Sequence, residues 1–137
     1  IELIADNGIV QNQGLVNASG TVGGDVLISG AGVENSGSLL AMGSVGQGGQ
    51  IHTLAQDMVI LKNDALLNAS GATGGGEILI GGDLKGENPA IQNAQNTFVG
   101  ENVQINADAT NTGNGGKVVV WADNAALYYG SISAKGG

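Results

Sequence analysis

The most constraining feature of this chain is a repeat in which two glycines precede one polar residue and a short apolar run. The four copies begin at Gly23, Gly48, Gly75 and Gly115. Self-similarity at this spacing is typical of a solenoid, because each unit buries its apolar side only against its neighbours. We expect the glycines to supply the positive φ angles of tight corners. A chain of this kind is expected to work through a long surface and not through a single pocket.

A second repeated element supports the same period. Its five copies align at Ala18, Met42, Ala69, Ala107 and Ala134, with steps of 24, 27, 38 and 27 residues. The long step therefore carries about eleven extra residues, which we place within residues 81–100 because this stretch holds the only proline. Solenoids accommodate such surpluses as loops on one face, so the sequence predicts an insertion loop there.

The composition favours strands over helices. Hydrophobic residues make up 42% of the 137 residues, mostly Val, Ile, Leu and Ala, whereas aromatics are only 3%. No apolar period of 3.6 persists, and Gly, Asn, Thr and Val are common. The sequence thus predicts an all-β fold, a right-handed parallel β-helix of about five coils with three short strands per coil. We interpret residues 1–137 as one β-helix segment, an internal fragment of a larger protein.

Alternation assigns side chains to the inside and outside of this helix. The predicted inward columns are Val26, Ile51, Ile78 and Val118; Ile28, Thr53, Ile80 and Val120; Val16, Leu40, Leu67, Ile105 and Ile132; and Ala18, Met42, Ala69, Ala107 and Ala134. The predicted outward column of the last strand is Asn17, Ala41, Asn68, Asn106 and Ser133. Its asparagines are expected to form a ladder of amide hydrogen bonds from coil to coil.

The charge balance excludes several classes of partner. The net charge is −8, and the only basic residues besides one histidine are four lysines. Nucleic acids and anionic membranes require clustered Lys or Arg, so neither is an expected partner. The absence of cysteine excludes disulfides and thiolate metal sites.

Two runs near the end of the chain resemble a known family. Residues 113–123 read Gly-Asn-Gly-Gly-Lys-Val-Val-Val-Trp-Ala-Asp, and residues 129–137 read Tyr-Gly-Ser-Ile-Ser-Ala-Lys-Gly-Gly. Together they resemble the β-helix repeats of filamentous haemagglutinin-type exoproteins, the secreted partners of bacterial two-partner secretion. The resemblance implies a protein exported through an outer-membrane transporter to the bacterial cell surface, where it acts in adhesion, aggregation or biofilm. It also implies an unidentified receptor or glycan as partner, and a secretion domain that lies outside this chain.

The titratable residues do not form the pattern of a catalytic or metal site, and we expect no enzyme activity and no cofactor. His52 is the only histidine and is expected to face solvent in an outward column with Leu27, Leu79 and Val119. That apolar stripe is expected to be covered by a flanking segment, another filament or a target, with packing inside the parent protein or fibre favoured. The Gly-Gly-Asp turns at Asp25 and Asp83 are interpreted as corners and not as Ca²⁺ sites, because the equivalent residue in the last copy is a lysine.

Other patterns leave alternatives open. Asp57 and Asp64 could face one another as hydrolase carboxylates, but no basic residue accompanies them. Asn17 and Asn68 fit glycosylation sequons by formula, and corner geometry explains them first. Of Tyr128 and Tyr129, only one can point inward, which leaves an exposed ring suited to stacking on a sugar. The alternative functions are therefore a self-assembling fibre subunit and a carbohydrate-binding or carbohydrate-processing β-helix.

Overall fold

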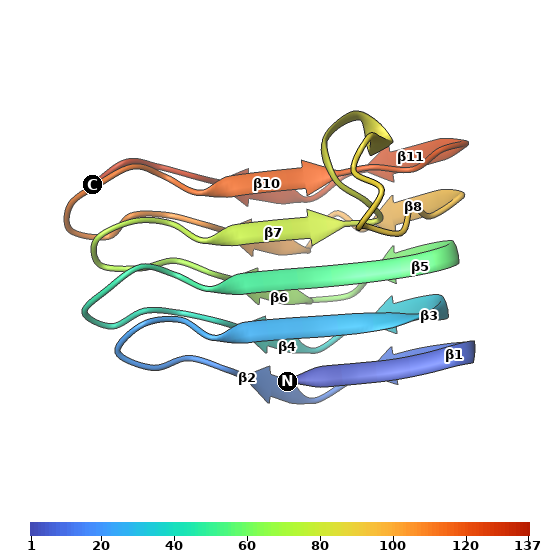
Figure 1. Cartoon of the computed structure of the whole chain (residues 1–137), viewed down its shortest axis with the longest axis horizontal. Coiled ribbons are helices and arrows are strands. Elements are labelled where there is room, and N and C mark those ends of the chain that lie inside the picture. Colours follow the sequence, from blue (N-terminus) through green and yellow to red (C-terminus); the bar gives the residue numbers. More distant parts are fainter.

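The computed structural model describes all residues from Ile1 to Gly137, and it is a parallel β-solenoid of about five coils (Figure 1). One sheet follows the order β1 (Glu2–Asn12), β3 (Asp25–Asn35), β5 (Gln50–Leu61), β7 (Glu77–Ile80) and β10 (Lys117–Val120), and it also takes in β8 (Asn96–Val99) and β11 (Ala125–Tyr128). The other sheet follows the order β2 (Leu15–Asn17), β4 (Ser38–Leu40), β6 (Leu66–Asn68), β9 (Gln104–Asn106) and β12 (Ser131–Ser133). The only helical element is a short 3-10 turn, η1 (Leu84–Gly86), so no helix is long enough to span a membrane.

The winding is the one that the sequence predicts. With the first coil at the bottom of Figure 1, the chain runs rightward along the near side, returns along the far side and climbs one strand per turn, which is a right-handed path. In the first three coils the first two predicted strands are joined as one bent strand, with register shifts between Ala5 and Ile9 and between Gly30 and Gly32. In the last two coils they are separate, as β7 with β8 and β10 with β11. The all-β, parallel β-helix prediction is therefore confirmed.

The core is a set of aliphatic columns that run through the stacked coils. The observed inner columns are Val26, Ile51, Ile78 and Val118; Ile28, Thr53, Ile80 and Val120; and Val16, Leu39, Leu67, Ile105 and Ile132. In the central coils these side chains are fully buried, whereas the terminal members are partly exposed because a neighbour lies on one side only. The two columns of the first strand are those predicted from alternation.

The predicted register of the second coil is wrong by one residue in its last strand. Leu39, and not Leu40, pairs with Val16 below it and is fully buried in the core. Ala41 is fully buried as well, so the small inward position belongs to Ala41 and not to Met42. The run of four apolar residues fits either alignment; because the connection before the last strand is as long as that in the first coil, Leu39 stacks on Val16.

The glycine pairs have a different physical role from the one predicted. Positive φ angles occur at Gly81, Gly82, Gly86 and Gly113, none of which belongs to a repeated pair. At the pairs, the second glycine donates a backbone hydrogen bond to the alanine that follows the last strand of the preceding coil. These bonds are Gly24 to Ala18 at 2.8 Å, Gly49 to Ala41 at 2.7 Å, Gly76 to Ala69 at 2.8 Å and Gly116 to Ala107 at 2.7 Å.

Such bonds bring the two walls of the solenoid, one formed by the first strands and the other by the last strands, into direct backbone contact. A Cβ atom added at Gly48 would lie 1.8 Å from the carbonyl oxygen of Ala69, and one at Gly75 would lie 1.9 Å from that of Ala107. Both approaches are far inside the van der Waals distance between a carbon and an oxygen atom. Glycine is therefore required for close approach, and the conformational freedom of its backbone is secondary.

The predicted asparagine ladder along the last strand is wrong. Asn17 and Asn68 each accept a hydrogen bond from the backbone two residues ahead, at 2.9 Å in both cases, which closes a local turn. A coil-to-coil amide bond lies elsewhere, at the ends of β1 and β3, where the Asn12 side chain donates to Asn35 at 2.8 Å. An asparagine side chain bonds to the backbone of its own turn more easily than to the asparagine of the adjacent strand, about 4.8 Å away. The outward asparagines therefore act as turn formers.

Candidate functional site

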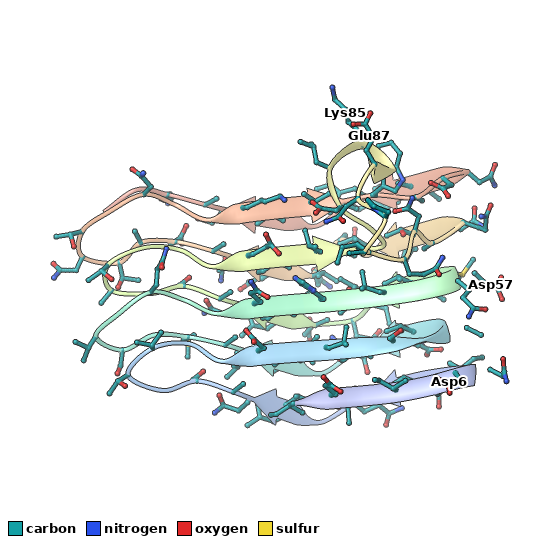
Figure 2. All side chains as sticks on the ribbon, in the orientation of Figure 1. Asp6, Asp57, Lys85 and Glu87 are labelled. Atoms are coloured by element: carbon teal, nitrogen blue, oxygen red, sulfur yellow. The ribbon has the colours of Figure 1, made fainter.

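An insertion between β7 and β8 is the one large departure from the repeat. In the third coil Thr53 and Met58 are five positions apart, whereas their ladder partners Ile80 and Asn96 are sixteen apart, so residues 81–95 include eleven extra residues. The insertion holds η1 and rises past β10 and β11 of the last coil (Figure 1). Lys85 and Glu87 lie at its outer tip (Figure 2). It is the most distinctive feature of the outer surface.

The insertion packs on Trp121 of the last coil. Added Cβ atoms would lie 3.0 Å from the indole Cδ1 at Gly82 and 2.7 Å from the indole Nε1 at Gly86, so the backbone of the insertion lies directly on the ring. Both glycines also have positive φ angles. The indole Nε1 donates to Asp123 at 3.0 Å, which fixes the plane of the ring. Trp121 thus acts as a platform for the insertion.

An ion pair holds the other side of the insertion. The Lys117 ammonium lies 2.7 Å from an Asp83 carboxylate oxygen and 3.7 Å from Glu77. Asp83 also accepts hydrogen bonds from the Asn88 side chain at 2.9 Å and from the Leu84 backbone at 2.7 Å. These bonds, with that from Asn88 the largest influence and that from Lys117 next, hold the pKa of Asp83 well below its usual value. The aspartate therefore stays ionised at neutral pH and anchors the loop.

These two attachments explain the apolar stripe on the outer face. Lys117 and Trp121 lie two residues before and after Val119 on the same face of β10, so an insertion that contacts both crosses over Val119. Val119 is 9% exposed and its ladder partner Leu79 is 1% exposed, although neither belongs to the inner core. The cover over Val119 is thus the insertion itself. Leu27, in the second coil, lies outside its reach and is half-buried.

His52 lies on the outer face but is not open to solvent. Its Nε2 atom lies 2.9 Å from a carboxylate oxygen of Glu77, whose other oxygen faces Lys117. The histidine side chain is 17% exposed, so the expectation that it faces solvent is only partly correct. His52, Glu77, Lys117 and Asp83 form a chain of polar and charged side chains that links three coils to the insertion.

The carboxylates singled out in the sequence are not gathered into a site. Asp25, Asp57 and Asp64 are exposed, and Figure 2 shows Asp57 at the edge where the strands bend, pointing away from the solenoid. No three His, Asp or Glu side chains are grouped so that they could hold a metal ion. Tyr128 continues the inward column of Leu61 and Val99 and is still 38% exposed, because no coil covers it.

A hollow of about 560 Å³ lies between the insertion and the last coil. Its polar lining includes Glu87, Asn88, Gln92, Asn93 and Asp123. The Asn93 side chain donates to the Gly86 carbonyl at 2.9 Å, while its oxygen is buried and has no partner. No pattern in the sequence indicates this hollow, because its residues come together only when the insertion is docked.

Docking of the insertion is expected to depend on the charge of Asp83. Since its pKa is lowered in the folded protein, the stabilisation is fully present above the unfolded value of about 3.9 and is lost as the pH falls below it. Asp83→Asn is expected to loosen the insertion at neutral pH, because it removes the ion pair with Lys117. The measurement is the emission maximum of Trp121, the only tryptophan, and its quenching by acrylamide.

The control for this prediction is Asp57→Asn, because Asp57 is an exposed carboxylate outside the insertion. It is expected to leave the emission unchanged. For the unmodified chain, emission is expected to stay constant from neutral pH down to about 4 and to shift to the red only below that. Equal emission and quenching in Asp83→Asn and Asp57→Asn would contradict the anchoring role of Asp83.

Comparison with known proteins places this geometry in context. No protein-family model matches the chain, and no curated protein matches it. Among solved structures, the crystal structure of the HMW1 secretion domain from Haemophilus influenzae superposes with a TM-score of 0.80 and 31% sequence identity. The match covers 99% of this chain and 39% of that one. This chain therefore resembles a two-partner secretion exoprotein in both fold and sequence.

The match confirms the resemblance that residues 113–123 and 129–137 indicated, to a β-helix of the filamentous haemagglutinin type. One expectation is not supported. The secretion domain was expected to lie outside this chain, yet the matched structure is itself a secretion domain. The repeats of such a domain and of the rod beyond it obey the same stacking rules, so glycine pairs alone cannot distinguish them. Similarity to a secreted exoprotein indicates an extracellular location.

Proposed function

We propose that this chain is a structural segment of a bacterial surface exoprotein, exported through an outer-membrane transporter and acting in adhesion, aggregation or biofilm. The observation that carries the proposal is the match, over 99% of the chain, to the HMW1 secretion domain. The segment works mechanically in this proposal. Parallel strands bond coil to coil, the aliphatic columns fill the interior, and the docked insertion presents Lys85 and Glu87 at a fixed place on the rod.

To test the proposal, the exoprotein that contains this chain is expressed in bacteria with and without its outer-membrane transporter. The proposal expects release to the cell surface or medium only when the transporter is present, together with stronger attachment and cell aggregation. Export without the transporter, or retention in its presence, would overturn the export step. Unchanged attachment and aggregation after surface display would overturn the adhesive role alone.

A matched variant separates the rod from its insertion. Residues 81–95 are replaced by the link that joins Thr53 to Met58 in the third coil, which the register shows to be compatible with the stack. If the insertion mediates adhesion, this variant is exported normally but attaches less well. Normal attachment would assign adhesion to another part of the exoprotein.

The hollow beside the insertion favours a second candidate function, which is binding of a neutral saccharide. Its amides and carboxylates are the groups that bind sugar hydroxyls, and about 560 Å³ lies within the usual range of ligand pockets. Gln92 lines the hollow, and its side-chain amide bonds only the adjacent Asn93 carbonyl, at 2.9 Å. Binding to a glycan array that is lost in Gln92→Ala would support this candidate. Identical array profiles for the two proteins would remove it.

A further inference from the structure

The chain contains two Asn-Gly dipeptides that the solenoid holds in different ways, Asn7-Gly8 and Asn114-Gly115. Asparagine before glycine is prone to an intramolecular reaction, because glycine has no Cβ to hinder it. The glycine amide nitrogen attacks the asparagine side-chain carbonyl carbon, closes a succinimide ring and releases ammonia. Water then opens the ring at either carbonyl and leaves aspartate or isoaspartate. The backbone must rotate for the nitrogen to reach the carbonyl carbon.

The first dipeptide lies where β1 bends. The ladder between β1 and β3 is interrupted after Ala5 and resumes at Ile9, so Asn7 and Gly8 have no partner in it. Both residues are exposed. A Cβ atom added at Gly8 would meet only the Ala5 side chain, at 3.7 Å. The surroundings therefore leave this peptide room to rotate.

The second dipeptide is part of a glycine pair and is confined between the walls of its coil. The Asn114 carbonyl accepts a hydrogen bond from the Gly75 nitrogen at 3.0 Å, which ties it to the coil below. A Cβ atom added at Gly115 would lie 1.9 Å from the Ala134 carbonyl oxygen. The next residue, Gly116, donates across the coil to Ala107 at 2.7 Å. Rotation of this peptide would break contacts on both sides.

We propose that Asn7 is a site of spontaneous conversion to aspartate and isoaspartate in the folded protein, and that the stack protects Asn114. The product places a second carboxylate beside Asp6, in a groove that Ser29, Gln56 and Gln92 also line. Isoaspartate adds one methylene to the backbone at a bend outside the ladder, so the coil can accept it without losing register. The modification thus makes this edge of the solenoid more acidic with age.

The experiment incubates the folded chain at mildly alkaline pH and follows both asparagines by peptide mapping with mass spectrometry. Conversion of Asn7 is expected to be faster than that of Asn114 by about tenfold or more, which corresponds to about 1.4 kcal/mol in activation free energy. In denaturant the two rates are expected to become similar. Equal rates in the folded chain, faster conversion of Asn114, or a rate difference that persists in denaturant would each overturn the proposal.

A matched variant tests the role of the glycine. Gly8→Ala is expected to slow conversion of Asn7 while it leaves the circular dichroism spectrum and the rate at Asn114 unchanged, because the added methyl group makes only an ordinary van der Waals contact, at 3.7 Å from Ala5. Labelling with an isoaspartyl methyltransferase detects the isoaspartyl product directly. Undiminished labelling in Gly8→Ala would show that the product forms at another residue and would contradict the assignment to Asn7.

Discussion

Gly48→Ala is expected to destabilise the solenoid by about 4 kcal/mol or more, although it adds only one methyl group. The added Cβ would lie 1.8 Å from the Ala69 carbonyl oxygen and 2.9 Å from the Gly76 nitrogen, both backbone atoms that cannot rotate away. The walls of the third coil would have to separate, which breaks the Gly49–Ala41 and Gly76–Ala69 bonds. The measurement is equilibrium unfolding in urea, followed by circular dichroism.

Gly14→Ala is the matched control, because an added Cβ there has no neighbour within 4 Å. It carries the same change in the entropy of the unfolded chain and is expected to alter stability by less than about 1 kcal/mol. If Gly48→Ala does not fold, the comparison becomes one of soluble yield and strand content under identical expression. Similar stabilities for the two variants would show that the walls are not in contact at the glycine pairs.

The glycine pairs therefore reveal the architecture for a different reason from the one that the sequence pattern indicates. Their regular spacing predicts a solenoid whether glycine is required for corners or for close contact between walls. Distinguishing the two reasons needs the partner of each glycine, which is an alanine between 6 and 9 positions earlier, at the end of the preceding coil, as in Gly24 with Ala18 and Gly116 with Ala107. The alanine column was visible in the sequence, and its pairing with the glycine column is the signal that could have revealed the contact.

The first strand of the second to fifth coils could be predicted residue by residue, because the glycine pair immediately before it fixes the register. The insertion could likewise be located from the length of one repeat. Its docking could not, because the outward stripe of Leu27, Leu79 and Val119 does not show which of several segments covers it. One spacing was nevertheless informative, because Lys117, Val119 and Trp121 are two residues apart and their side chains therefore lie on one face. Val119 is buried between the Lys117 ion pair and the Trp121 ring, and a segment that covers this face explains all three.

The last strand of the second coil is where the sequence pattern failed, and a pair of substitutions tests the corrected register. Leu39→Ala is expected to destabilise the solenoid by about 2–5 kcal/mol, because Leu39 is fully buried between Val16 and Leu67 and its loss leaves a cavity that two ladders hold open. Leu40→Ala is expected to cost less than about 1 kcal/mol, because Leu40 lies in the outward column between Asn17 and Asn68.

The two leucines are adjacent, belong to the same strand and lose the same atoms on substitution, so the comparison removes differences in strand propensity and in the unfolded chain. Urea unfolding of both variants measures the difference directly. A larger loss for Leu40→Ala would restore the register in which Met42 and not Ala41 occupies the small inward position. Because one residue of slippage exchanges the inner and outer faces of a strand, no intermediate register can account for equal losses. Equal losses would instead require both leucines to be buried, one of them beneath a segment that covers the outer face of β4.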